Sequence, residues 1–335
     1  GDTVLYTLDS NNPLTSSTAQ MGITPFYVTI NPTSNTNRAI TPAVNLRAAV
    51  YQSGYNDSKI LTYTYIFLSN VLTQGRPYGS WPAPGTYNGQ SIDYNMDSRV
   101  VNATAYKDSV DDALLSIPSF SITTDLSNLF DEYTGIYVNA YGDGIAWERP
   151  ANIELIYPDG RTGFNINGGI RIRGGYSRIG SNPKHAFRIF FRDQYGPKDL
   201  DYPLFDTEGV SEYEKFDLRT SQNYSWSFAG DKQNIMVRDV FSRDIQGLMG
   251  HLYTRSRFYH LYLNGMYWGL FQTQERGSKE HAESYLGGKK NDYDVIKVDN
   301  SNYTIYATDG TIDAWQTVWD LCVAGFSTNQ NYYTL

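Results

Sequence analysis

The chain has 335 residues, a length typical of about two domains of roughly 150 residues each. Hydrophobic residues make up 40% and charged residues 19% of it, which excludes wholesale disorder, collagen and coiled coil. The formal net charge of −8 argues against a general nucleic-acid-binding protein, because phosphate contacts need concentrated basic surface. Cys322 is the single cysteine, so no disulfide forms within the chain, and with four histidines a dedicated zinc site is not expected.

The sequence contains no apolar run near the ~20 residues that a bilayer-spanning helix needs, so no membrane span is predicted. Its first residues show neither the basic nor the apolar region of a signal peptide. We therefore expect that a signal has been removed or that the chain is an interior piece of a longer protein. The 29 tyrosines and 29 glycines, with many Asn, Ser and Thr, are typical of secreted or surface-exposed bacterial proteins, and we expect an extracellular or cell-surface location.

The first 70 residues alternate between short apolar stretches and turn-rich segments such as Asp9-Ser10-Asn11-Asn12-Pro13. This pattern predicts a small antiparallel β-sandwich. The expected strands are residues 4–8, 26–30, 45–51 and 60–67.

Three stretches of this segment resemble the chitobiase C-terminal-like β-sandwich module. They read YTLDS at residues 6–10, LRAAVY at 46–51 and YTYIF at 63–67. The resemblance implies a first domain over residues 1–70 that acts as a spacer beside another domain. Its aromatic side chains make a glycan a candidate partner, although packing in a core explains them more simply.

Residues 71–118 are rich in Pro and Gly and carry an acidic stretch, which predicts a linker with one short helix at 109–115. A second domain is expected over 119–335, with an α+β pattern. Asn264-Gly265 suits a type I′ turn, because both central residues need positive φ. The expected strands are 119–123, 153–157, 169–173, 186–192, 258–263 and 267–274, and the expected helices are 234–249, 278–286 and 312–324.

A basic segment from Arg161 to Arg192 contains no Asp or Glu, although it carries six arginines and one lysine. Arg171 and Arg173 are two residues apart in a predicted strand and so share one face. The glycine-rich turn at 174–178 supplies backbone N–H groups that can approach phosphate oxygens. Charge alone leaves two interpretations open: a phosphate or nucleotide site, or a strand face paired with nearby acids, which is the simpler of the two.

Several separated blocks between residues 119 and 335 resemble the spore-coat protein H (CotH) kinase family, a group of atypical, secreted kinase-like proteins. The blocks stand in the family's order: SITTDLSNLFDEYTGIYVN at 121–139, GIRIRGGYSR at 169–178, PKHAFR at 183–188, MVRD at 236–239 and LYLNGMYWGLFQTQE at 261–275. The resemblance implies a kinase-like nucleotide cleft. Phosphoryl transfer there needs cations near the phosphates, carboxylates on Mg²⁺ and a positioned acceptor hydroxyl.

The resemblance further implies roles for five residues. Lys184 takes the phosphate-binding lysine role, with Arg173 and Arg178 assisting, and Arg238 is the next candidate. Glu275, after the predicted hairpin, orients a cation or the ribose. For each of them a structural salt bridge is the alternative, most of all for Arg238 and Glu275.

The resemblance places the family's Mg²⁺-binding and catalytic aspartates in segments expected downstream of Leu335, so no catalytic or metal-binding residue is assigned here. The expected fold is an all-β sandwich followed by an α+β kinase-like domain, its N-lobe and hinge region without the catalytic C-terminal part. The expected function is that of a fragment of a secreted kinase that transfers phosphate from ATP to Ser or Thr of surface or matrix proteins, with ATP and Mg²⁺ as cofactors of the longer parent. The alternative is a non-catalytic structural or adhesive surface protein with a kinase-like fold.

Overall fold

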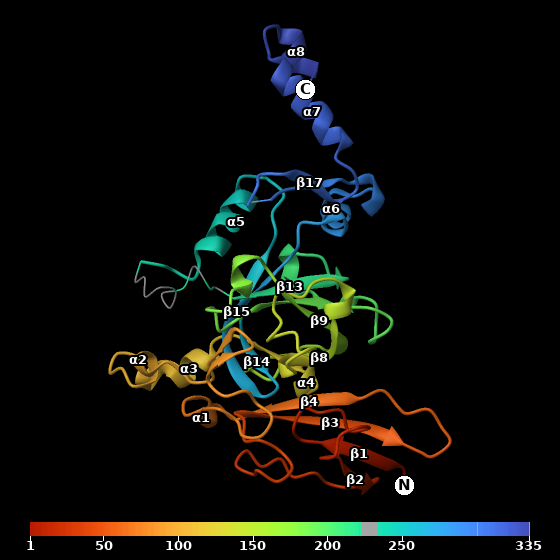
Figure 1. Ribbon diagram of the computed structural model, residues 1–335, viewed down its shortest axis with the longest axis vertical. Helices are drawn as coiled ribbons and strands as arrows, with labels where there is room; N and C mark the ends of the chain where they lie inside the picture. Colours follow the sequence, from red (N-terminus) through yellow and green to blue (C-terminus); the bar gives the residue numbers. More distant parts are fainter. Residues whose placement is uncertain (221, 223–224, 226–232, 300, 335) are drawn as a thin grey trace. The chain divides into compact units, whose positions relative to one another are not determined.

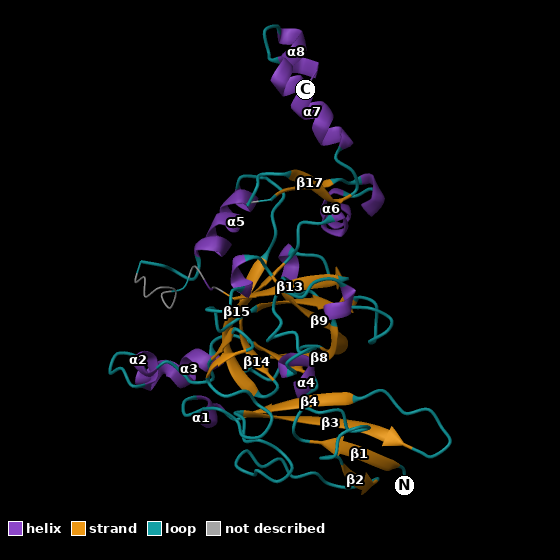
Figure 2. Cartoon of the chain, in the orientation of Figure 1, coloured by secondary structure: helices purple, strands orange, loops and turns teal. Residues whose placement is uncertain are grey.

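The computed structural model describes residues 1–335 except 221, 223–224, 226–232, 300 and 335 (Figure 1). The described part is mostly β-structure with few helices (Figure 2). Its longer strands are β1 (Thr3–Thr7), β2 (Gln20–Ile23), β3 (Ala43–Tyr51), β4 (Leu61–Ile66), β7 (Ser119–Thr123), β8 (Arg149–Ile156), β9 (Asn165–Arg173), β10 (Ala186–Phe190), β13 (Lys215–Thr220), β14 (Ser256–Leu263) and β15 (Met266–Gln274).

The described part of the chain also contains three two-stranded sheets, eight α-helices and several short 3-10 helices. The two-stranded sheets are β5 (Gly85–Tyr87) with β6 (Gln90–Ile92), β11 (Leu200–Asp201) with β12 (Glu212–Tyr213), and β16 (Val295–Val298) with β17 (Ile305–Asp309). The helices are α1 (Leu68–Val71), α2 (Ser98–Val101), α3 (Val110–Leu115), α4 (Leu126–Phe130), α5 (Arg238–Leu248), α6 (Lys279–Leu286), α7 (Asp313–Ala324) and α8 (Asn329–Thr334).

The N-terminal strands form one antiparallel sheet in the order β2-β1-β3-β4. The prediction of a strand at 26–30 is wrong, because β2 already pairs with the edge of β1 and residues 26–30 lie outside the sheet. The described residues of this segment also form a single sheet where the alternation predicts a sandwich. The buried face of β3 explains the difference, since it carries Asn45 and Arg47, which a second apolar sheet would leave without partners.

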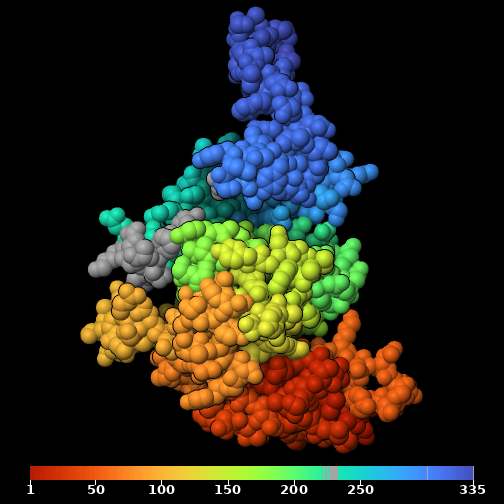
Figure 3. Space-filling view, viewed as in Figure 1, coloured from red at the N-terminus to blue at the C-terminus, as the bar shows by residue number. Residues whose placement is uncertain are grey.

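Polar contacts join this sheet to the second group of strands. Asn45 Nδ2 donates to Ser121 Oγ at 3.4 Å, and Arg47 Nη1 pairs with an Asp125 oxygen at 2.7 Å. The backbone N–H of Thr64 donates to a Glu154 carboxylate oxygen at 2.9 Å. The sheet, coloured red and orange in Figure 3, thereby belongs to the same compact unit as the strands that follow it.

The second group of strands closes into a barrel in the order β10-β13-β15-β14-β7-β8-β9 (Figures 1 and 2). Its pairs are antiparallel except for β14 with β7. Asn264 and Gly265, at φ 47° and 80°, join β14 to β15, which confirms the predicted turn residues. The expected strands all lie in this barrel: 119–123 is observed with those bounds as β7, and 153–157, 169–173 and 186–192 have shifted ends in β8, β9 and β10.

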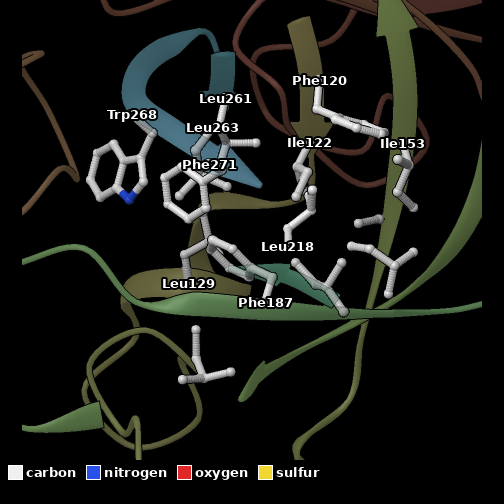
Figure 4. Packing of buried hydrophobic residues seen from close by; sticks show 14 of the residues in the cluster. Phe120, Ile122, Leu129, Ile153, Phe187, Leu218, Leu261, Leu263, Trp268 and Phe271 are labelled. Carbon is white, nitrogen blue, oxygen red and sulfur yellow. The ribbon is translucent and has the colours of Figure 1, made fainter. Parts of the chain in front are cut away.

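The interior of the barrel is filled by alternate apolar side chains of its strands. Phe120, Phe187, Leu218 and Leu261 are fully buried there, and Figure 4 shows them converging from four different strands. Because side chains alternate between the two faces of a strand, the intervening positions point away from this core. In β9, β10 and β13 these positions hold charged residues, and these residues form the candidate site on the outer face of the barrel.

The chain consists of two compact units. The first comprises residues 1–241 and 255–274, and the second comprises 242–254 and 275–335. The predicted helices at 109–115, 278–286 and 312–324 are confirmed as α3, α6 and α7, while the helix expected from residue 234 begins at Arg238. The expected boundaries near residues 70 and 119 remain predictions.

Candidate functional site

The outer face of the barrel carries a row of charged and polar side chains across β9, β10, β13 and β15. Backbone pairing sets Arg171 opposite Arg188, Arg188 opposite Asp217, and Asp217 opposite Gln274. Ile170 and Ile172, between the arginines of β9, are buried in the core. The alternation predicted for Arg171 and Arg173 is therefore observed, and charged side chains lie side by side on three neighbouring strands of this face.

The carboxylate of Glu148, the residue immediately before β8, forms ion pairs with two arginines of the basic segment. Its side chain is fully buried, with Arg171 Nη2 at 2.7 Å and Arg192 Nε at 2.9 Å from its carboxylate oxygens. Both guanidiniums also lie over the ring of Phe190, at 4.3 and 4.9 Å from its centroid. We call Glu148, Arg171 and Arg192 the Glu148 cluster.

The carboxylate of Asp217, in the middle of β13, forms ion pairs with two more arginines. Its side chain is 2% exposed, with Arg188 Nε at 2.6 Å and Arg173 Nε at 3.0 Å from its two oxygens. Arg188 is bidentate, since its Nη2 also donates to Asp217 Oδ2 at 3.1 Å. We call Asp217, Arg173 and Arg188 the Asp217 cluster.

The same face continues toward the start of α5. Arg219 Nη1 lies 2.6 Å from Asp239 Oδ2, and it also donates to Gln274 Oε1 at 2.5 Å. Gln272 Nε2 donates to the same Asp239 oxygen at 2.9 Å. Asp239 thus ties the first turn of α5 to β13 and β15.

The charges of this face do not cancel. In each of the two clusters, two guanidiniums share one carboxylate, so the three side chains that define the cluster carry a formal charge of +1. The side chains of Arg171, Arg173 and Arg188 are 18%, 26% and 19% exposed, so solvent reaches part of each guanidinium. The basic segment is therefore paired with acids, as the simpler interpretation predicts, and still retains a positive excess that attracts anions.

Lys184 lies in different surroundings from Arg173. Its ammonium donates to the backbone carbonyl of Asp93 at 2.8 Å and stands 3.9 Å from the centroid of the buried Trp268 ring. Burial lowers the pKa of Lys184 to about 8, and the Asp93 charge opposes this shift. The predicted phosphate lysine is thus held against an aromatic ring of the core.

The lowered pKa of Lys184 predicts a dependence of stability on pH. Between about pH 8 and 10.5 the unfolded chain binds more protons than the folded chain, so the free energy of unfolding rises with pH in that window. We expect Lys184→Met to remove this rise and Lys198→Met, at a 73% exposed side chain, to retain it. Urea unfolding at several pH values measures the difference, and parallel pH profiles for wild type and Lys184→Met would contradict it.

Arg178 lies within electrostatic reach of the Asp217 cluster. Burial lowers its pKa, Asp143 opposes that effect and the charge of Arg188 adds to it. Its Nη2 donates to the backbone carbonyl of Ile172 at 3.1 Å, so the guanidinium folds back over the end of β9. The glycine-rich turn is held in place by Ser177, whose hydroxyl donates to the carbonyl of Arg173 at 3.1 Å.

The remaining two predicted residues belong to different parts of the chain. Arg238 is exposed at the start of α5, in the first unit. Glu275 belongs to the second unit, where it is buried, accepts a hydrogen bond from the Tyr285 hydroxyl and lies 3.6 Å from His281 Nε2. The role of each in nucleotide binding remains a prediction.

The structure therefore brings Arg173 and Arg178 to one face and adds residues that the sequence did not single out. These are Arg188, Asp217, Arg219, Asp239 and Gln272. For Asp217 and Arg219 the signal in the sequence was the alternation of polar and apolar residues in KFDLRT, which marks a strand face without saying which strands adjoin it.

A comparison with protein-family models covers the arginines of this face. The family model described as CotH kinase protein matches residues 170–320. The resemblance to the CotH kinase family is confirmed over that segment. The matched residues include every arginine of both clusters, Asp217 and the β14–β15 hairpin. None of the curated proteins matches the chain.

The site residues fit the two expected cofactors unequally. The positive excess and partial exposure of the Asp217 cluster suit a phosphate group of ATP. For Mg²⁺, the described ranges contain no group of three or more His, Cys, Asp or Glu side chains arranged to hold a metal ion.

The helices described in this chain do not include one with the length and apolar character needed to cross a bilayer.

Proposed function

We propose that this CotH-like chain binds ATP through its phosphates on the outer face of the barrel and serves a secreted, atypical protein kinase. In this proposal the phosphoryl group goes to Ser or Thr of an extracellular or cell-surface protein. The family match over residues 170–320 is the observation that carries the proposal, since it covers the arginines of the face.

The Asp217 cluster is the part of the face best suited to hold a phosphate. Arg188 and Arg173 present N–H donors around one carboxylate, and Arg178 adds a third cation from the turn after β9. A phosphate binds guanidinium groups through charge-assisted hydrogen bonds, each worth about 1.5–3 kcal/mol. Asp217 holds Arg173 and Arg188 in place, so the two side chains lose little conformational entropy when a phosphate binds.

The proposal is tested by titrating the 335-residue chain with ATP in a calorimeter, with and without Mg²⁺. We expect Arg188→Met to weaken ATP binding by roughly 10- to 100-fold, because one charge-assisted contact is lost. Asp217 still pairs with Arg173 in this variant, so the barrel is expected to fold.

Arg192→Met is the matched control, since it also removes one of two arginines from a buried carboxylate and leaves Glu148 paired with Arg171. Its ATP affinity should stay within about threefold of wild type. No ATP binding by the wild-type chain, or equal binding by wild type and Arg188→Met, would refute the proposal.

A second candidate function is a structural or adhesive role without catalysis. The pairing of Glu148 and Asp217 with four arginines favours it, because such ion pairs also serve purely to hold strands together. Incorporation of radiolabelled phosphate from ATP into casein by the longer parent protein, reduced when it carries Arg188→Met, would decide against this alternative.

A further inference from the structure

The Glu148 cluster, which the proposed ATP site does not use, presents hydrogen-bond donors to solvent. Glu148 oxygens lie 2.9 and 2.7 Å from Nε and Nη2 of Arg171, and 2.9 and 3.4 Å from Nε and Nη2 of Arg192. Within the described part of the chain, the Nη1 group of neither arginine has an acceptor, and neither group is shut off from solvent. The two side chains are 18% and 39% exposed. An anion from outside can therefore bind to donors of both guanidiniums.

The surroundings of the cluster hold its two guanidiniums in place. Both pack over the ring of Phe190, and both pair with the fully buried Glu148 carboxylate. Glu148 and the ring of Tyr195 lie next to Gly169, where a side-chain carbon would come within 2.8 Å of the carboxylate and 2.6 Å of the ring. The glycine thus leaves room for the acid that aligns the arginines. Because the arginines are already ordered, they lose little conformational entropy when an anion binds.

The charge of the cluster favours an anion with one negative charge. The cluster carries a formal charge of +1, so one bound carboxylate makes it neutral, whereas a phosphate dianion would leave an excess negative charge. A carboxylate also matches the planar fork of guanidinium donors. Asp193, next to Arg192 in the chain, is exposed, so water screens its charge. The cluster therefore suits a carboxylate better than a phosphate.

The cluster lies on the outer face of the barrel, which favours a side chain of a partner protein over a free small molecule. Small molecules bind mostly in concave sites that enclose them. A cavity of about 330 Å³ in the first unit is lined by no residue of the cluster. An Asp or Glu side chain on an extended segment of another protein can reach an open face of this kind.

The Glu148 cluster and the Asp217 cluster adjoin each other across the strands. Arg171 is paired opposite Arg188, and Arg188 opposite Asp217. Neighbouring strands are about 4.8 Å apart, so Arg171 and Asp217 are separated by about 10 Å along this row. An extended peptide covers about 10–14 Å in three or four residues. One segment can therefore place a carboxylate on the Glu148 cluster and a hydroxyl near a phosphate held by the Asp217 cluster.

We propose that Nη1 of Arg171 and Nη1 of Arg192 together bind the carboxylate of an Asp or Glu side chain in the protein that receives the phosphoryl group. The substrate class is an extended acidic segment whose Ser or Thr lies about three or four residues from the acid. The assignment of this segment to the phosphoryl acceptor rests on the proposed function, whereas the carboxylate site rests on the cluster alone.

Fluorescence anisotropy with the 335-residue chain, at constant ionic strength, tests the proposal. The probes are three labelled peptides of equal length, made of Gly with a central Ser and, about four residues away on each side, Glu, Gln or Lys. We expect the Glu peptide to bind at least about tenfold more tightly than the Gln peptide, and the Lys peptide to bind most weakly. Equal binding of the Glu and Gln peptides, or displacement of the Glu peptide by ATP, would overturn the proposal.

Two variants of Arg192 locate the carboxylate. Arg192→Met removes the more exposed guanidinium, and Arg192→Lys keeps the charge but loses the Nη1 donor. Glu148 stays paired with Arg171 in both variants, so the barrel is expected to fold. We expect Arg192→Met to weaken binding of the Glu peptide about tenfold, and Arg192→Lys about threefold.

Arg99→Met is the matched control, since it removes the same charge from a 75% exposed side chain outside the cluster. Its affinity for the Glu peptide should stay within about twofold of wild type. Equal weakening by Arg192→Met and Arg99→Met would overturn the proposal, because net charge alone would then account for the binding.

Titration of the same chain with ATP distinguishes this inference from the proposed function. ATP binding without a preference for the Glu peptide overturns the carboxylate site alone. A preference for the Glu peptide that depends on Arg192, without ATP binding, supports the carboxylate site and refutes the kinase proposal.

Discussion

Replacing Glu148 by Gln is expected to lower the free energy of unfolding of the barrel by about 3 kcal/mol. Its side chain is fully buried, and it neutralises Arg171 and Arg192 at 2.7 and 2.9 Å. Removing one partner of a buried ion pair typically costs 3–5 kcal/mol. The expected loss is at the lower end of this range because Arg171 and Arg192 are 18% and 39% exposed, so water partly solvates the charges that remain. Urea unfolding followed by circular dichroism measures the loss.

The control for this substitution is Asp159→Asn. Asp159 pairs with Arg161 at 3.3 Å, but both side chains are more than half exposed. Water screens such a pair, so the expected change is within about 0.5 kcal/mol. Equal stabilities for Glu148→Gln and Asp159→Asn would show that Glu148 does not hold the two arginines in solution.

Trp268→Ala is expected to destabilise the barrel by about 3–5 kcal/mol, the usual cost of truncating a buried aromatic side chain. Trp268 is fully buried at 0% exposure, and its ring packs edge-on against Tyr137 at 5.4 Å between centroids. Its indole N–H also donates to the Tyr137 hydroxyl at 2.9 Å. The truncation therefore opens a cavity, removes a buried hydrogen bond and takes away the ring under Lys184.

Trp319→Ala serves as the comparison, since this tryptophan on α7 is 49% exposed. We expect it to leave the unfolding transition of the barrel within about 0.5 kcal/mol of wild type. If Trp268→Ala unfolds at the same urea concentration as Trp319→Ala, Trp268 is not part of a well-packed core.

Local patterns in the sequence were sufficient for most of the barrel strands and for the turn that joins β14 to β15. Alternation in GIRIR identified which side chains of β9 face the core, because the strand period is two residues. Asn264-Gly265 identified the hairpin, because few other pairs adopt positive φ at both positions. The same alternation failed at 26–30, where the edge of β1 was already occupied by β2.

The partners of the basic segment could not be predicted in this way. Glu148 lies 23 residues before Arg171, and Asp217 lies 29 residues after Arg188. Both acids are therefore outside the basic segment from Arg161 to Arg192. Short strands pair with neighbours that are distant in the chain, and no local pattern specifies which strands will adjoin. Lys184 shows the same limit, since burial lowers its pKa and its ammonium lies against the ring of Trp268, 84 residues later in the chain.

The sequence by itself determined the β-rich pattern, the position of Arg171 and Arg173 on one strand face and the resemblance to the CotH kinase family, which the family model matches over residues 170–320. Tertiary structure alone decided that the strands close into a barrel, that two buried carboxylates share four arginines, and that five separate segments line one cavity. The physical reason is that residue type and period act over a few positions, whereas pairing of charges and enclosure of space depend on contacts between residues far apart in the chain.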